Sequence, residues 1–149
     1  MNPEIQSILD DRVAQIHHVL GAVVVTQDGV FRCMSGWNLR ADSEQEAAEA
    51  RRQHGERLAA IASGMSSLAV QQAGYQSGGP VLRTVVEMES GWCVTSRAGS
   101  HCVIALYATK EANLGALGFE VTELANQLGD MLDVDRRELA TAQQSWQNR

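Results

Sequence analysis

Two short runs that are apolar at every position constrain the fold of this chain more than any other feature. They span residues 22–25 and residues 102–107. A strand with one face in water alternates apolar and polar residues, so a strand that is apolar on both sides must be covered on both faces. Both runs are therefore predicted to be neighbouring central strands of one sheet that has helices over each of its faces.

Further strands are predicted on either side of these two. The dipeptide Asp28-Gly29 follows the first run and has the signature of a type I′ hairpin that leads into another strand. The second run ends a meander of three strands joined by short turns. In the first of these, residues 81–88, the charged side chains of Arg83 and Glu87 share one side with apolar residues. Only the other side is predicted to be fully covered, which is typical of an edge strand.

Two helices are indicated before the meander by their capping residues. The N-terminal helix has Asn2 as its N-cap and Pro3 at its first position. The charged segment 40–55 has no large apolar residue, but its composition favours a helix and Ser43 fits a capping box. We predict a solvated helical insert interrupted at Gly55, with a flexible charged linker as the alternative.

A last helix is predicted from the apolar stripe over residues 114–131. The stripe continues at helical spacing as far as Trp146, so the helix either extends past the domain as an arm or ends in a frayed tail. We therefore divide the chain into one domain, residues 1–133, with a C-terminal helical extension or tail, residues 134–149.

The helix predicted over residues 56–69 has two unlike faces. Its large apolar residues fall on one side of a helical wheel and are predicted to cover the sheet: Leu58, Ile61, Met65 and Leu68. The opposite side carries small uncharged residues: Ala59, Ala60, Ser63, Gly64 and Ser67. A solvent-facing helix normally carries charges, and a mid-helix glycine costs about 1 kcal/mol relative to alanine. We therefore predict that the small face contacts its copy in a homodimer while strand 81–88 pairs with its own copy; packing against a helix of the same chain is the alternative.

Charge and composition narrow the classes of partner. The formal net charge of −6 disfavours nucleic acid and anionic lipid, which bind basic surfaces. The sequence has no run of about 18 apolar residues and no basic n-region before an apolar segment, so we expect a cytoplasmic protein without membrane insertion. The three cysteines have no C-x-x-C spacing and are predicted to be buried thiols.

Motifs for catalysis, cofactors and metals are missing from the sequence. There is no P-loop, no nucleophile elbow and no grouping of histidines with metal-ligand spacing. We therefore expect no catalytic residues, no cofactor and no metal. A small-ligand sensor remains an alternative, with a pocket between sheet and helix formed by Met34, Trp37, Met65, Met88 and Trp92.

Several segments in combination resemble the Roadblock / dynein light chain family, especially its bacterial branch. They are GAVVVTQDGV, ERLAAIASGMSSLA, VLRTVVEMESGWCVTSRAGSHCVIALYA and LGALGFEVTELANQLGDML. The resemblance covers residues 5–132 and implies an α+β sandwich with the topology αββαβββα. The implied sheet is antiparallel, with the order 2-1-5-4-3, one helix on one face and two on the other. The resemblance also implies a homodimer joined through the second helix and the third strand.

The same resemblance implies partners. Bacterial members often work with small Ras-like GTPases, as activating partners or in membrane-associated assemblies that include a sensor kinase-like protein. Matched position by position, the implied dimer or GTPase interface comprises Ala59, Ala60, Ser63, Gly64, Ser67, Val81, Arg83 and Val85. We expect a non-enzymatic homodimeric regulator of such a GTPase, held at a membrane only through its partners. A small-ligand sensor and a purely structural dimerisation scaffold are the alternatives.

Overall fold

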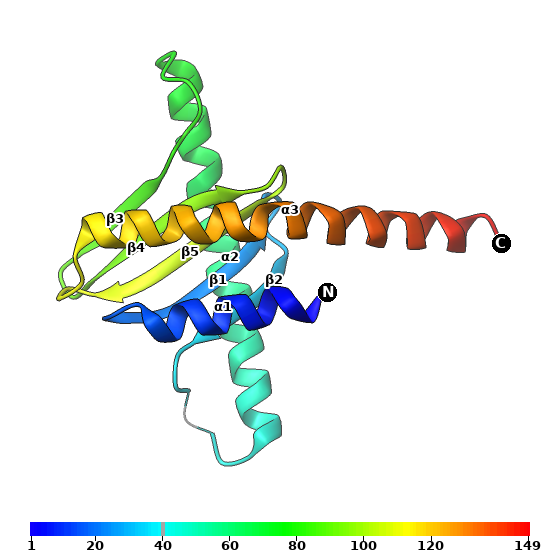
Figure 1. Cartoon of the computed structure of the whole chain (residues 1–149), viewed down its shortest axis with the longest axis horizontal. Helices are drawn as coiled ribbons and strands as arrows, with labels where there is room; N and C mark the ends of the chain where they lie inside the picture. The colour runs from blue at the N-terminus through cyan, green and yellow to red at the C-terminus, as the bar shows by residue number, and fades with distance from the viewer. Residues whose placement is uncertain (40) are drawn as a thin grey trace.

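The computed structural model describes residues 1–39 and 41–149. Its elements follow the predicted order of helix, two strands, helix, three strands and helix (Figure 1). In chain order they are α1 (Pro3–Gln15), β1 (Val19–Thr26), β2 (Phe31–Gly36), α2 (Glu44–Tyr75), β3 (Thr84–Met88), β4 (Gly91–Ala98), β5 (Cys102–Thr109) and α3 (Leu114–Gln147).

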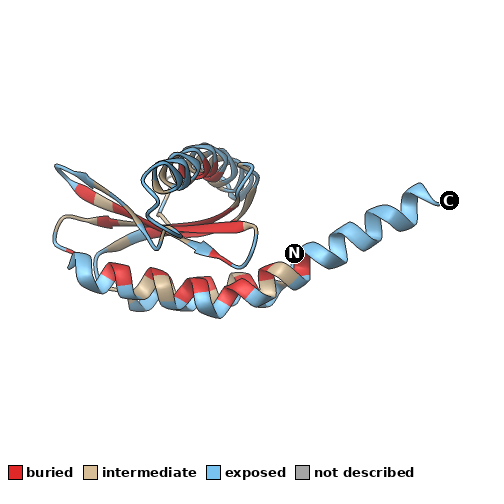
Figure 2. Ribbon diagram, turned by 90° about the horizontal axis from the view of Figure 1, so that it is seen from above, coloured by how far each residue is buried: buried red, intermediate tan, exposed pale blue. Residues whose placement is uncertain are grey.

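The five strands form one antiparallel sheet in the order β2-β1-β5-β4-β3, as predicted. The central strands β1 and β5 pair with each other, and Val23 lies opposite Ala105. Both residues are fully buried, which confirms that strands apolar on both sides occupy the centre of the sheet. Figure 2 shows the sheet between α2 on one face and the layer that contains α3 on the other.

Two hydrophobic cores lie on opposite faces of the sheet. The larger lies under α1 and α3 and includes Leu9, Leu106 and Leu124. The smaller lies under α2, where the helix contributes only alanines to the fully buried set, Ala59 and Ala62. Small side chains let α2 lie close to the sheet.

The predicted helix caps are present. The Asn2 side chain accepts a hydrogen bond from the Glu4 amide at 2.9 Å, and the Ser43 hydroxyl accepts one from the Glu46 amide at 3.2 Å. The predicted interruption at Gly55 is wrong, because α2 runs unbroken through it. A Cβ on Gly55 would lie 2.5 Å from the Phe31 ring, so this glycine serves close packing within the helix. The charged segment is therefore helical from Glu44 onward, and its first residue, Arg40, lies outside the described residues.

The hairpin between β1 and β2 differs from the predicted type I′ turn. Within this turn only Gly29 has a positive φ, 92°, whereas type I′ needs positive φ at both central residues. The Gly29 amide donates to the Thr26 carbonyl at 3.0 Å, and the Thr26 amide donates to the Val30 carbonyl at 2.9 Å. These bonds describe a type I turn followed by a left-handed glycine, the usual three-residue hairpin loop.

The helix α3 continues past the body of the domain. Its last buried residue is Asp135, which accepts a hydrogen bond from the Asn2 amide at 3.0 Å and forms an ion pair with Arg32. Beyond that point every residue is exposed, and the helix projects as an arm (Figures 1 and 2). The helix does not break at the boundary predicted after residue 133, and that division of the chain stays a prediction. In the described part of the chain, no helix has both the length and the apolar character that a bilayer span requires.

Candidate interaction surface

The face of α2 that meets the sheet carries mostly small side chains, together with Leu58, which is partly buried against the core. Ala59 is fully buried, and the Ser63 hydroxyl donates to the Gln27 carbonyl at 2.6 Å. The prediction that the large residues cover the sheet is wrong for two of them, because Ile61 is 57% exposed and Leu68 is 67% exposed. At the close approach of α2 to β1 and β5, the space beneath the helix holds alanine and serine but not a row of leucines.

This orientation divides the predicted interface residues of α2. Ala59 and Ser63 lie under the helix and are buried within the domain, so the exposed side of α2 does not include them. Ala60, Gly64 and Ser67 lie on the exposed side. A Cβ placed on Gly64 would meet no atom within 4 Å, so nothing inside the domain requires a glycine there.

The strand β3 is an edge of the sheet and pairs only with β4 among the described strands. It begins at Thr84, later than the predicted residue 81, so Val81 and Arg83 precede it. Val81 is half-buried, and the Arg83 guanidinium donates to the Thr122 hydroxyl at 3.1 Å. Val85 lies in the strand and is 45% exposed.

Grooves flank β3 on both faces of the sheet. On the α2 side, a groove of about 610 Å³ runs between the end of the helix and the segment that leads into β3, and Leu82 and Val85 are among its lining residues. On the α3 side, a groove of about 550 Å³ is lined by Val85, Leu114 and Phe119. Phe119 is 62% exposed. Apolar side chains therefore border the free edge from above and below.

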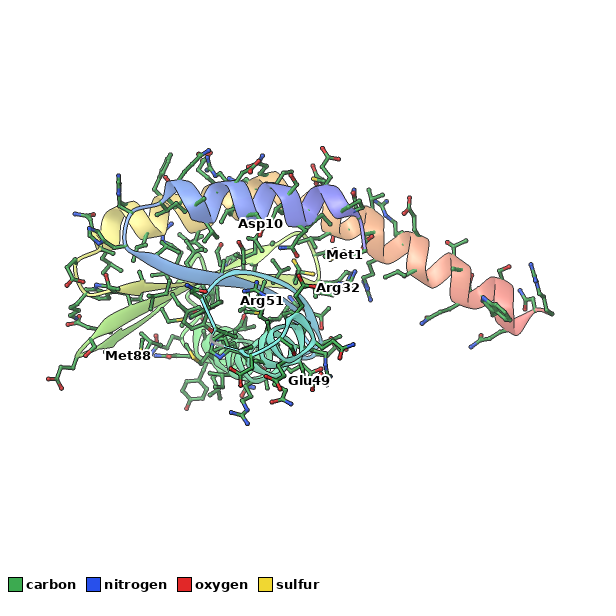
Figure 3. The ribbon with its side chains drawn as sticks, turned by 90° about the horizontal axis from the view of Figure 1, so that it is seen from below. Met1, Asp10, Arg32, Glu49, Arg51 and Met88 are labelled. Atoms are coloured by element: carbon green, nitrogen blue, oxygen red, sulfur yellow. The ribbon has the colours of Figure 1, made fainter. Side chains whose placement is uncertain are left out.

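We define the α2–β3 surface as eight exposed, uncharged residues of α2, of β3 and of the segment that leads into β3. They are Ala60, Ile61, Gly64, Ser67, Leu68, Leu82, Val85 and Met88. Met88 lies beside α2 at this edge of the sheet (Figure 3). Exposed apolar residues that lie together, as opposed to singly, mark sites of interaction. The sequence reasoning missed Ile61 and Leu68, which it had assigned to the sheet.

A family model of the Roadblock/LC7 domain matches residues 5–108, which is more than half of the chain. The chain belongs to the Roadblock/LC7 family. A Roadblock/LC7 domain from Streptomyces avermitilis is 30% identical over 85% of this chain and 95% of that chain, with a TM-score of 0.67. No curated protein matches the chain.

Two bacterial structures share the Roadblock fold at low identity. MglB from Myxococcus xanthus is 13% identical, with a TM-score of 0.71 over 88% of this chain and 96% of that chain. The gliding protein MglB from Thermus thermophilus is also 13% identical, with a TM-score of 0.68 over 86% of this chain and 87% of that chain. At this identity the likeness concerns the fold alone.

The three cysteines of this Roadblock domain are buried free thiols. Desolvation raises the pKa of the Cys33 thiol to about 12 and that of Cys93 to about 11, so both stay protonated at neutral pH. Burial likewise raises the pKa of Cys102. Among the described residues, no three His, Cys, Asp or Glu side chains are grouped so that they could hold a metal ion.

The pocket predicted for a small-ligand sensor does not form in this Roadblock domain. Met34 and Trp37 belong to the core under α2, whereas Trp92 packs against the core on the opposite face of the sheet. The space between sheet and helix is occupied by Trp37 itself, whose ring would lie 2.3 Å from a Cβ on Gly21. The five predicted residues therefore do not line one cavity.

Proposed function

We propose that this Roadblock protein is a homodimeric, non-enzymatic regulator of a small Ras-like GTPase and that the α2–β3 surface makes its contacts. The observation that carries the proposal is the outward position of large apolar side chains on α2. Ile61 and Leu68 are more than half exposed in the isolated chain. Fully burying such a side chain contributes about 1.5–3 kcal/mol, so a second polypeptide on this face gains from covering them.

The unpaired edge of β3 supports a second copy of the chain as the first occupant. An edge strand presents free amide and carbonyl groups, and antiparallel pairing of β3 with its own copy satisfies them across a two-fold axis. The same axis brings the two α2 helices together. Because Gly64 has no side chain, it allows their backbones to approach closely.

Regulation of a GTPase by such a dimer needs contact and no catalytic group of its own. A surface that binds one arrangement of the GTPase switch segments better than the other shifts their population. Two exposed arginines, Arg83 and Arg57, lie near the surface, and neither has a feature that identifies it as an arginine finger, the residue that stabilises transition-state charge in some GTPase activators. Arg83 is hydrogen-bonded to Thr122, and Arg57 lies on the exposed side of α2. This geometry supports an adaptor role, or activation by ordering the GTPase's own residues.

The proposal is tested with the purified chain and the small Ras-like GTPases encoded in the same genome. Each GTPase is loaded with GDP or with a non-hydrolysable GTP analogue, and binding is measured by interferometry. We expect a dimer by light scattering, binding that depends on the nucleotide, and loss of binding on Leu68→Asp. The proposal would be contradicted if the chain were monomeric, or if it bound neither the GDP-loaded nor the GTP-analogue-loaded GTPase.

Hydrolysis measured in the same samples separates an activator from a passive adaptor. A dimer that binds no GTPase would instead support the structural scaffold. The sensor kinase-like partner, cytoplasmic location and membrane association through partners remain predictions from the family resemblance.

A further inference from the structure

The two edge strands of the sheet differ in the hydrogen bonds that their backbones receive from surrounding side chains. The strands β2 and β3 both lie at an edge. In the part of the chain that the structure describes, no side chain hydrogen-bonds to the backbone of β3, from Thr84 to Met88. The backbone of β2, by contrast, is contacted by polar side chains from both helix layers.

The first of these contacts comes from α1. The Gln6 side-chain amide donates to the Met34 carbonyl at 2.9 Å. The same nitrogen donates to the Asp10 carboxylate, one helical turn further on, also at 2.9 Å. Asp10 thereby holds the Gln6 side chain in the position from which it reaches the strand.

The second contact comes from the charged N-terminal part of α2. The Arg51 guanidinium donates to the Gly36 carbonyl at 2.7 Å and to the Trp37 carbonyl at 3.1 Å. Figure 3 shows Arg51 between α1 and α2, at the side of the molecule where β2 lies. No ion pair involves Arg51 among the described residues, so its hydrogen bonds go to the strand end.

The carbonyls of Met34 and Gly36 are the ones that an added strand would use. In a strand, backbone groups of successive residues point to opposite sides. The Trp37 amide donates inward to the Leu20 carbonyl of β1 at 2.8 Å, so Ser35 and Cys33, at alternate positions in the same register, also point toward β1; the register shifts beyond Cys33, so this alternation does not extend to Phe31. Met34 and Gly36 therefore point outward, and Gln6 and Arg51 occupy their acceptors.

We infer that Gln6 and Arg51 are specificity residues of assembly: they close the β2 edge so that self-association takes place through β3 alone. The inference rests on the proposed function in one respect, because a closed pair assumes that β3 joins two copies. A chain with one self-complementary edge forms a closed dimer, whereas a chain with two such edges forms an open-ended array. This gives the charged insert of α2 a role, since it supplies Arg51.

The decisive variant is the double substitution Gln6→Met/Arg51→Met. Methionine is a good helix former that keeps an unbranched side chain but has no donor. The matched control is Gln15→Met/Arg136→Met, which adds the same apolar groups at exposed positions without hydrogen bonds to either edge. Mass is measured by light scattering over a concentration series, and amide exchange is followed in peptides that cover β2 and β3.

In the wild-type chain and the control, protection of β3 should rise with concentration while that of β2 stays constant. In the double variant, the mass should rise to about twice that of the wild type or more, since each β2–β2 contact joins two pairs, and β2 should gain protection over the same range. A double variant that matches the wild type would overturn the inference. So would a control that associates equally, or a wild-type β2 edge whose protection depends on concentration.

The single variants Gln6→Met and Arg51→Met each open one carbonyl and are used if circular dichroism shows that the double variant does not fold. Failure of the proposed dimer has a different signature. The wild-type chain would then be monomeric with no concentration dependence at β3, while association of the variant through β2 would still support the closed edge.

Discussion

Substitution of Gly64 by lysine is expected to have opposite effects on the stability of the isolated domain and on the affinity of the proposed dimer. Gly64 lies in the middle of α2, and a Cβ there would meet nothing within 4 Å. Within one chain the variant therefore introduces no clash. Glycine is about 1 kcal/mol less favourable than alanine in a helix, and lysine is close to alanine, so the isolated domain should gain about 0.5–1 kcal/mol in its free energy of unfolding.

The effect on the proposed dimer has the opposite sign. Two lysines would face each other across the axis, and like charges brought together at an interface cost several kcal/mol. A loss of about 3 kcal/mol corresponds to a dissociation constant raised by about 100-fold. At a concentration about tenfold above the wild-type dissociation constant, the variant should therefore be mostly a monomer by light scattering.

Gly74 provides the matched control, because it lies in the same helix and a Cβ there also meets nothing within 4 Å. Gly74→Lys should gain similar helix stability but keep the dimer. The melting temperature of the wild type and of Gly74→Lys should rise with protein concentration, whereas that of Gly64→Lys should not. A Gly64→Lys variant that keeps the wild-type mass and concentration dependence would refute the assignment of this face.

Three further outcomes follow from the packing and the titrating groups. Gly129→Ala should lower the free energy of unfolding by about 1–2 kcal/mol in chemical denaturation, because its Cβ would lie 2.7 Å from the Gly99 amide nitrogen and overpacking outweighs the gain in helix propensity. Hydrogen bonds from Ser100 lower the pKa of Asp133, so this carboxylate stabilises the fold above its unfolded pKa and the effect disappears as pH falls through the folded value. In thermal denaturation at pH 7, the free energy of unfolding of Asp133→Asn should therefore be lower than that of the wild type by about 1 kcal/mol at most, and the difference should shrink as the pH falls below about 4 and vanish only below the lowered pKa of Asp133. Because burial raises its pKa to about 12, Cys33 should react with a thiol reagent at pH 8 only as fast as the chain unfolds, and rapid labelling of the native protein would contradict its burial.

The sheet could be predicted from the sequence because its central strands carry a local signal. Residues 22–25 and 102–107 are short, rich in β-branched residues and apolar at every position, and a strand with that pattern must be covered on both faces. The caps at Asn2 and Ser43 were predictable for the same reason, since a helix cap acts within four residues.

The contacts that close the β2 edge could not be predicted in this way. Gln6 and Met34 meet only after α1 has packed on the sheet, and Arg51 reaches Gly36 only because α2 continues through Gly55. A glutamine and an arginine on charged helices are indistinguishable in the sequence from solvated surface residues. Their role depends on the distance between a helix and the edge strand in the folded protein, and the periodicity of the sequence carries no information about that distance.

The orientation of α2 differs from the predicted one because of a physical quantity that a helical wheel lacks, the distance between helix and sheet. A wheel places the larger residues inward, but Gly55, Ala59, Ala62 and Ser63 recur at helical spacing and form a stripe that permits close packing. The sheet takes the small stripe, and Ile61 and Leu68 are left outside. More than half of each remains to be buried, so covering each contributes about 1–2 kcal/mol, counted twice in a symmetric pair. The large residues therefore strengthen the case for a partner on this face, because the domain retains them where a charged side chain would cost it nothing.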